Sequence, residues 1–173
     1  MRKLMAGCLI WLFASLSVAS ANQCEASHES LDKVGETRLK VFLFNVYDAS
    51  LFTDTGAYED FETLALRIDY LRDISAKALI ERTEKEWGKL EIEVTERHRE
   101  WLEELEQTWP DIKKGDCLVA YWQKNEGLQF INRDGRLGES FPDEFAEDFV
   151  SIWLAEESSY RENRNELVGE RND

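Results

Sequence analysis

The sequence lacks the motifs of the commonest enzyme classes. Its 173 residues hold no glycine-rich phosphate loop, no dinucleotide-binding glycine pattern, no nucleophile elbow and no HExxH helix. Histidine is scarce: His28 and His98 are the only two, and no zinc ligand set can be assembled around them. His98 lies near the inner face of a predicted helix, where a lone histidine is more often a satisfied core residue than a base. We therefore expect neither a metal centre nor a cofactor.

Positive charge is also in short supply. The chain has 21 lysines and arginines against 36 aspartates and glutamates, which gives a formal net charge of -15. Phosphate backbones and anionic lipid headgroups repel such a chain, which argues against nucleic acid as a partner and against peripheral membrane binding. The carboxylates are scattered along predicted helices and form no calcium-loop pattern, so we interpret them as a solvated face.

A long apolar run occurs only at the N-terminus. Arg2 and Lys3 precede an apolar stretch that ends in Ala19, Ser20 and Ala21, the pattern of a secretory signal peptide cleaved after Ala21. No later stretch has the ~20 apolar residues of a spanning helix. We therefore expect residues 1–21 to be a signal peptide, and the mature protein to be periplasmic or secreted, with no stable membrane insertion after cleavage.

The mature chain has the length of one domain. We interpret residues 22–33 as a polar, exposed lead-in and residues 34–173 as the folded domain. Cys24 and Cys117 are the two cysteines left after cleavage, and in an oxidising compartment they are a candidate disulfide. The alternative is that Cys117 is a buried strand residue and Cys24 lies on a mobile tail.

Residues 34–52 have the strongest strand pattern in the chain. Apolar residues occupy both parities, which predicts a central strand, or two strands meeting at a bulge near Asn45, covered on both faces. Arg38 shares a parity with Phe42 and Phe44, so its guanidinium is a candidate to lie at the opening of an apolar layer. The alternative is an arginine that snorkels at a strand end or pairs with a carboxylate.

The remaining patterns predict an α+β fold. Further strands are expected at residues 61–71, 117–123 and 128–132, and tight turns separate the last strands. Helices are expected at residues 75–88 and 94–108, from near Pro142, and after a capping box formed by Ser159 and Glu162. The order of strands and helices favours an antiparallel sheet with helices gathered on one side.

Three stretches resemble the bacterial chalcone isomerase-like family: residues 34–52, 66–79 and 127–154. The resemblance implies an open-faced β-sandwich, in which a curved antiparallel sheet is backed by a layer of helices with a ligand cleft between them. The superfamily includes plant enzymes that cyclise chalcones to flavanones, and non-catalytic members that bind fatty acids. In both, an arginine early in the central strand region faces the negative oxygen of the ligand, and Arg38 looks like its counterpart.

The resemblance to the enzymes is incomplete. They use a threonine on the strand after the arginine, yet no aliphatic hydroxyl lies between Arg38 and Tyr47. They also use a tyrosine and an asparagine from the helical section, and neither residue type occurs between Arg72 and Ala120. Cyclisation needs a held phenolate and polar groups that stabilise the developing enolate, so the departures argue against this catalysis.

The sequence therefore favours a binding protein for a lipophilic anion such as a fatty acid. In this hypothesis Arg38 pairs with the carboxylate, and Tyr47 or Tyr70 adds a hydrogen bond. The chain of the ligand would contact apolar side chains of the strand and a helix, namely Phe42, Phe44 and Leu79. The alternatives are an isomerase or lyase with a different residue set, and a non-catalytic partner protein that docks through exposed aromatics.

Signal cleavage gives the first testable prediction. When a bacterium exports the full chain, we expect the mature protein to begin at Asn22, because signal peptidase cuts after small residues spaced as Ala19 and Ala21 are. Intact-protein mass spectrometry of the exported fraction measures this. Replacing both alanines with leucine should leave the precursor uncleaved, and an uncleaved wild-type chain in that fraction would contradict the assignment.

Overall fold

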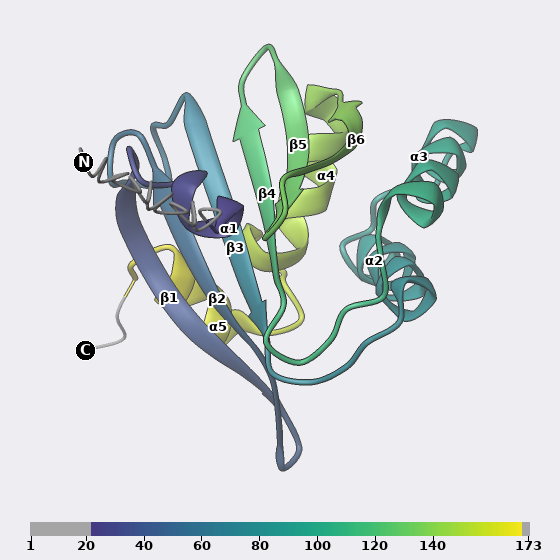
Figure 1. The fold of residues 1–173 in the computed structure, drawn as a ribbon, viewed down its shortest axis with the longest axis horizontal. Helices are drawn as coiled ribbons and strands as arrows, with labels where there is room; N and C mark the ends of the chain where they lie inside the picture. Colours follow the sequence, from purple (N-terminus) through teal and green to yellow (C-terminus); the bar gives the residue numbers. More distant parts are fainter. Residues whose placement is uncertain (1–21, 171–173) are drawn as a thin grey trace, which may run out of the picture.

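The computed structural model describes residues 22–170, so the predicted signal peptide lies outside the described residues. Six strands form one antiparallel sheet in the order β1 to β6, and the sheet curves as Figure 1 shows. The elements are α1 (Gln23–Ala26), β1 (Asp32–Val41), β2 (Phe44–Thr53), β3 (Thr63–Tyr70), α2 (Ala76–Lys89), α3 (Glu96–Thr108), β4 (Cys117–Gln123), β5 (Gly127–Asn132), β6 (Arg136–Phe141), α4 (Asp143–Leu154) and α5 (Arg161–Leu167). The predicted α+β class is confirmed.

The two faces of the sheet are covered unequally. The larger hydrophobic core joins one face to the helices that follow β3, and α4 lies against β4 and β5 while α5 lies against β1. On the other face a small core of Cys24, Ala65, Cys117 and Val119 lies under α1. This is the open-faced arrangement that the family resemblance implies. No helix within residues 22–170 has the length and apolar character needed to cross a bilayer.

Residues 34–52 form a hairpin and not one continuous strand. β1 and β2 pair antiparallel, and the turn between them consists of Phe42 and Leu43. A register shift follows, because Leu39 pairs with Tyr47 whereas Lys40 pairs with Asn45. The bulge expected near Asn45 is therefore present. It lies two residues beyond the turn of Phe42 and Leu43, which the apolar pattern of residues 34–52 does not reveal.

Helix α4 is fixed by a row of aromatic side chains. Phe145, Phe149 and Trp153 recur every four residues and so lie on one face of the helix. Phe149 packs edge to face against Phe130 of β5, with ring centroids 5.1 Å apart, and Phe145 stacks on Phe141 at 4.2 Å. Such ring pairs add to the burial of large apolar areas, and together they fix α4 on β5 and on the end of β6.

Helix α5 approaches β1 closely enough to require glycine. A Cβ at Gly35 would collide with the carbonyl oxygens of Glu166 and Leu167, so the helix backbone rests directly on the strand. The predicted capping box is wrong: Tyr160 is the N-cap and makes no side-chain cap bond, whereas the Ser159 hydroxyl donates to the Glu86 carboxylate of α2.

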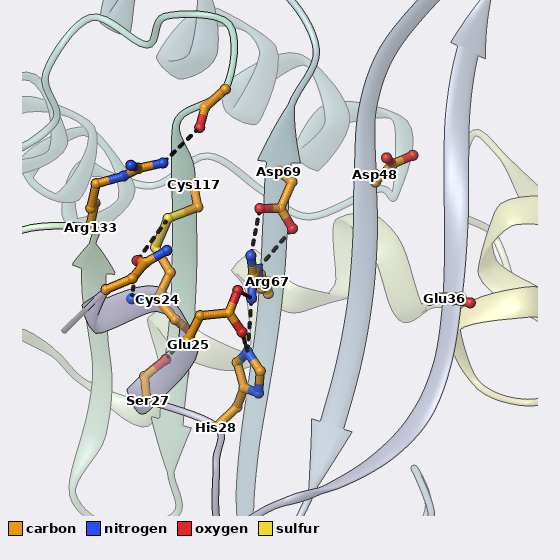
Figure 2. Close-up of polar contacts among 12 residues, drawn as sticks. Cys24, Glu25, Ser27, His28, Glu36, Asp48, Arg67, Asp69, Cys117 and Arg133 are labelled. Atoms are coloured by element: carbon orange, nitrogen blue, oxygen red, sulfur yellow. Dashed lines mark hydrogen bonds and ion pairs between the residues drawn. A yellow bond between two sulfur atoms is a disulfide. The ribbon is translucent and has the colours of Figure 1, made fainter.

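The segment predicted as an exposed lead-in is partly folded. Gln23–Ala26 form α1, with the Asn22 side chain accepting a hydrogen bond from the Cys24 backbone at 3.1 Å, and Cys24 is buried in a disulfide with Cys117 of β4. Figure 2 shows this bond beside a charged group, in which Arg67 of β3 contacts Glu25 at 2.6 Å and Asp69 at 2.8 Å. These contacts hold α1 on the sheet face opposite the other helices.

The disulfide should contribute strongly to stability. It closes a loop with a sequence separation of 93 residues, and such a cross-link restricts the unfolded chain. We expect the Cys24→Ala/Cys117→Ala variant to lose about 2–4 kcal/mol of unfolding free energy, measured by urea denaturation. Reductant should lower the unfolding free energy of wild type by the same amount, and it should leave the unfolding free energy of the variant unchanged. A variant as stable as wild type would contradict this role.

Candidate functional site

A cavity of about 300 Å³ lies between the inner face of the sheet and helices α2, α4 and α5. Its walls are mostly apolar, and residues that represent each wall are Leu39, Leu66, Ile68, Leu79, Phe149 and Ile152. The lining residues Ala78 and Arg82 of α2 are exposed, so the cavity opens on that side. Its size falls at the lower end of the ~300–1,000 Å³ typical of small-molecule sites.

Two buried tyrosines provide hydroxyl groups in this apolar lining. The hydroxyl of Tyr47 accepts a hydrogen bond from the Trp153 indole at 2.9 Å, which connects β2 to α4. Tyr70 is 6% exposed, and its hydroxyl bonds no other residue in the described part of the chain. Burial raises the pKa of both phenols, so both stay protonated and can donate to a ligand at neutral pH.

A charged corner lies where α2 meets the loop before α5. One Arg82 nitrogen contacts the Glu86 carboxylate at 2.7 Å and donates to the Tyr160 hydroxyl at 3.1 Å. The Arg82 side chain is 46% exposed, and its Nε and Nη1 groups bond no residue within residues 22–170. Unused guanidinium N–H groups at the edge of an apolar cavity are suited to a carboxylate.

Glu86 holds this corner together. Its side chain is 4% exposed and receives the Lys89 ammonium at 2.9 Å as well as the Ser159 hydroxyl and Arg82. Burial alone would raise the pKa of the Glu86 carboxyl, but the Ser159 hydrogen bond, Lys89 and Arg82 together lower it. Glu86 is therefore ionised, and it orients Arg82 without neutralising every donor of the guanidinium.

Arg164 is the other cation in the cavity wall, and it is already engaged. Its guanidinium is buried and donates to the Leu154 carbonyl at 3.2 Å, to Asn165 at 3.2 Å and to Glu170 at 2.5 Å. These bonds tie α5 to the C-terminal end of α4. Arg164 is therefore structural, which leaves Arg82 as the better candidate for an anion.

Arg38 does not lie in the cavity wall, and the face assigned to it must be corrected. Thr37, Leu39 and Val41 of β1 line the cavity, so Arg38 has the opposite parity and faces out. Its side chain is 49% exposed and forms a two-pronged pair with Asp48, at 2.5 and 2.8 Å. This pairing is the alternative interpretation of the sequence, in which Arg38 pairs with a carboxylate and does not face a ligand. Its surroundings are polar, an open acidic depression that includes Glu36, Asp48, Asp69, Glu162 and Glu166.

Phe42 and Phe44 also lie away from the cavity. β1 ends at Val41, so the strand parity that grouped these residues with Arg38 does not extend through the turn. Phe42 is 95% exposed and Phe44 is 61% exposed. Of the predicted ligand contacts, the structure brings Tyr47, Tyr70 and Leu79 together and leaves Arg38, Phe42 and Phe44 outside.

The sequence contained a weak signal for the residues it missed. Helical spacing puts Thr83 and Trp87 on the inner face of α2, and Glu86 lies three residues after Thr83, on the same face. A carboxylate on an apolar stripe needs a partner, and Arg82 stands four residues before it. The hydrogen bond from Trp153 to Tyr47 had no such signal, because it joins elements far apart in the chain.

His98 is a satisfied core residue and lies outside the cavity lining. Its side chain contacts the Asp148 carboxylate at 3.0 Å and the Thr95 hydroxyl at 2.8 Å, and its ring packs edge to face on Trp87. Among residues 22–170 no group of three or more histidine, cysteine or acidic side chains could hold a metal ion.

Comparisons with known proteins agree on the fold. The family model described as chalcone isomerase-like matches residues 13–169. An uncharacterised protein of Haemophilus influenzae is 31% identical over 127 residues, which cover 73% of this chain and 62% of that protein. The chain thus spans less than two thirds of the relative. The crystal structure of a fatty-acid binding protein of Arabidopsis thaliana aligns with a TM-score of 0.62 and 10% identity, covering 82% of this chain and 88% of that one.

The charged corner predicts a specific pH dependence. Because the pKa of Glu86 is lower in the folded chain than in the unfolded chain, its stabilisation is present at neutral pH and is lost as the pH falls through the folded pKa. We expect Glu86→Gln to cost about 1–3 kcal/mol at pH 7, measured by urea denaturation. The gap between wild type and variant should shrink below about pH 4. A gap that is constant from pH 7 to pH 3 would contradict the ionised assignment.

Proposed function

The chain belongs to the chalcone isomerase-like family, and from this premise we propose that its cavity binds a lipophilic acid such as a fatty acid, without catalysing a reaction on it. One observation carries the proposal: at the open side of an apolar chamber lies Arg82, a cation whose Nε and Nη1 groups bond no residue within residues 22–170. The Arabidopsis fatty-acid binding protein, which has a similar fold, supports this reading.

The ligand would lie with its carboxylate at the charged corner and its hydrocarbon chain inside. Burying hydrocarbon against the apolar walls supplies roughly 25 cal/mol per Å² removed from water. A carboxylate left without a partner in the same chamber would be strongly disfavoured. Arg82 supplies charge-assisted hydrogen bonds at the exposed side, and the unpaired hydroxyl of Tyr70 offers a further donor.

The alternative of an isomerase has no specific observation in its favour. Stabilising an enolate requires donors arranged around one reacting oxygen. In this cavity Trp153 donates to the Tyr47 hydroxyl, which leaves Tyr47 one O–H to donate, and Glu86 is fully occupied by its partners. The partner-protein alternative assumed that side chains fill the cleft, whereas the protein retains an open chamber.

We further propose that binding takes place outside the cytoplasm. The signal-peptide pattern of residues 1–21 supports export, and a disulfide between Cys24 and Cys117 is suited to an oxidising compartment. A carrier with an apolar chamber would keep a lipophilic acid dispersed there.

A matched pair of arginine variants tests the ligand proposal. We expect native and extracted mass spectra of the exported protein to contain a stoichiometric fatty acid or similar amphiphile. Arg82→Gln should weaken the binding of added fatty acid by roughly tenfold or more, because it removes a charge-assisted contact. Arg38→Gln should bind as wild type does, because Arg38 faces away from the cavity.

The reverse result would place the carboxylate at Arg38, on the outer face of the sheet, and would contradict the assignment to Arg82. If wild type carries no amphiphile and takes up none, the proposal fails. Circular dichroism and the urea midpoint of each variant separate a lost contact from a lost fold.

A further inference from the structure

Three consecutive apolar side chains, Phe42, Leu43 and Phe44, project from the turn between β1 and β2; we call them the hairpin tip. Their exposed fractions are 95%, 95% and 61%, and they are the exposed large hydrophobic residues of the described chain. Only the guanidinium of Arg72 lies over one of them, 5.3 Å from the centre of the Phe44 ring. Exposed apolar residues scattered singly need no explanation, but a contiguous group suggests an interaction site.

The backbone at the tip is unfavourable for its residues. Phe42 has a φ of 55°, in the left-handed region where a bulky side chain is strained. Two-residue hairpin turns place glycine or asparagine at such positions. A phenylalanine at this position strains the turn, so its presence points to a role for the exposed side chain.

Two cations lie close to the tip, although the net charge of the protein is -15. Arg38 is paired with Asp48, but Lys40 and Arg72 form no ion pair within residues 22–170. Lys40 is exposed one residue before the end of β1, and Arg72 lies over Phe44. Apolar rings flanked by cations match the phosphate layer and the acyl boundary of a phospholipid bilayer.

The tip is continuous with the cavity. Val41 and Val46, which flank the tip on the two strands, both line the chamber. The Leu71 backbone donates to the Val46 carbonyl at 3.0 Å, so the segment leading into α2 lies beside the base of the hairpin. Figure 1 shows the hairpin extending alone beyond the rest of the molecule, at the bottom of the view.

We propose that the hairpin tip inserts into the surface of a phospholipid bilayer, with Lys40 and Arg72 on the headgroup phosphates. The cavity would then lie at the membrane surface, where a lipophilic acid can pass between bilayer and chamber; this second step rests on the proposed function. Lys40 also borders the acidic depression that contains Asp48, and repulsion by carboxylates more than about 8 Å from the phosphates is screened at physiological salt. The net charge of -15 argued against membrane binding by the whole chain, but it does not prevent the hairpin tip from contacting a bilayer.

Flotation with vesicles tests the membrane contact. The vesicles contain phosphatidylcholine with a minority of phosphatidylglycerol, and the protein is the mature chain. Phe42→Gly/Leu43→Ser should lower the partition coefficient by roughly tenfold or more, because it removes the inserted apolar area. Glycine suits the backbone at position 42, so the urea midpoint of this variant should not fall.

A matched pair of lysine variants tests the headgroup contact. Lys40→Gln should lower binding to these vesicles by about fivefold, the effect of one basic residue near an anionic surface. Lys124→Gln removes the same charge from the β4–β5 turn, at the opposite end of the sheet, and should bind as wild type does.

Wild type that does not float, or a tip variant that floats equally well, would overturn the inference. So would a tip variant that converts a dimer to a monomer in sedimentation while neither form floats, because the tip would then contact a second copy. Fatty-acid binding in vesicle-free solution is measured in parallel. A protein that floats but binds no fatty acid refutes the ligand proposal alone, and one that binds but does not float refutes the membrane contact alone.

Discussion

The packing of α4 against β4 and β5 is the interaction on which the cavity depends. Phe149 and Phe130 meet within the larger core, and Trp153 continues the same helix face to reach the Tyr47 hydroxyl on β2. The other two walls attach to this helix: α2 packs on α4, and Arg164 of α5 bonds the Leu154 carbonyl at its end. Helix α4 thus holds α2 away from strands β1 to β3 while α5 rests on β1, and the chamber is the space that remains.

Most elements of the fold follow from local patterns in the sequence. Alternation identified β3, β4 and β5, and helical spacing with Ser75 as N-cap identified α2, because both signals depend on neighbours within a few residues. The capping box predicted at Ser159 was wrong because the partner of Ser159 is not a neighbour in the chain. Its hydroxyl is used by Glu86 in another helix, and no local pattern reveals a partner 73 residues away.

The site was less predictable than the fold. Alternation shows that two faces of a strand differ, but it does not show which face the helices cover, and Arg38 was placed on the wrong one. Its assignment also assumed that parity continued to Phe44, whereas two residues form a turn that contains no glycine or asparagine. Tyr47 and Tyr70 lie in the cavity wall because both belong to paired strands whose inner face is continuous.

The close contact at Gly35 divides the cavity into a fixed wall and an adjustable one. Because α5 rests on β1 through backbone atoms, that side cannot move inward without displacing the edge strand. Helix α2 is held by α3 and α4 instead, and its side chains Ala78 and Leu79 face the chamber. Under the proposed function, exchanging these two residues should change the length of acid admitted while every strand pairing is kept. If relatives bind acids of different length, the differences in sequence should then accumulate on α2 and not on α5.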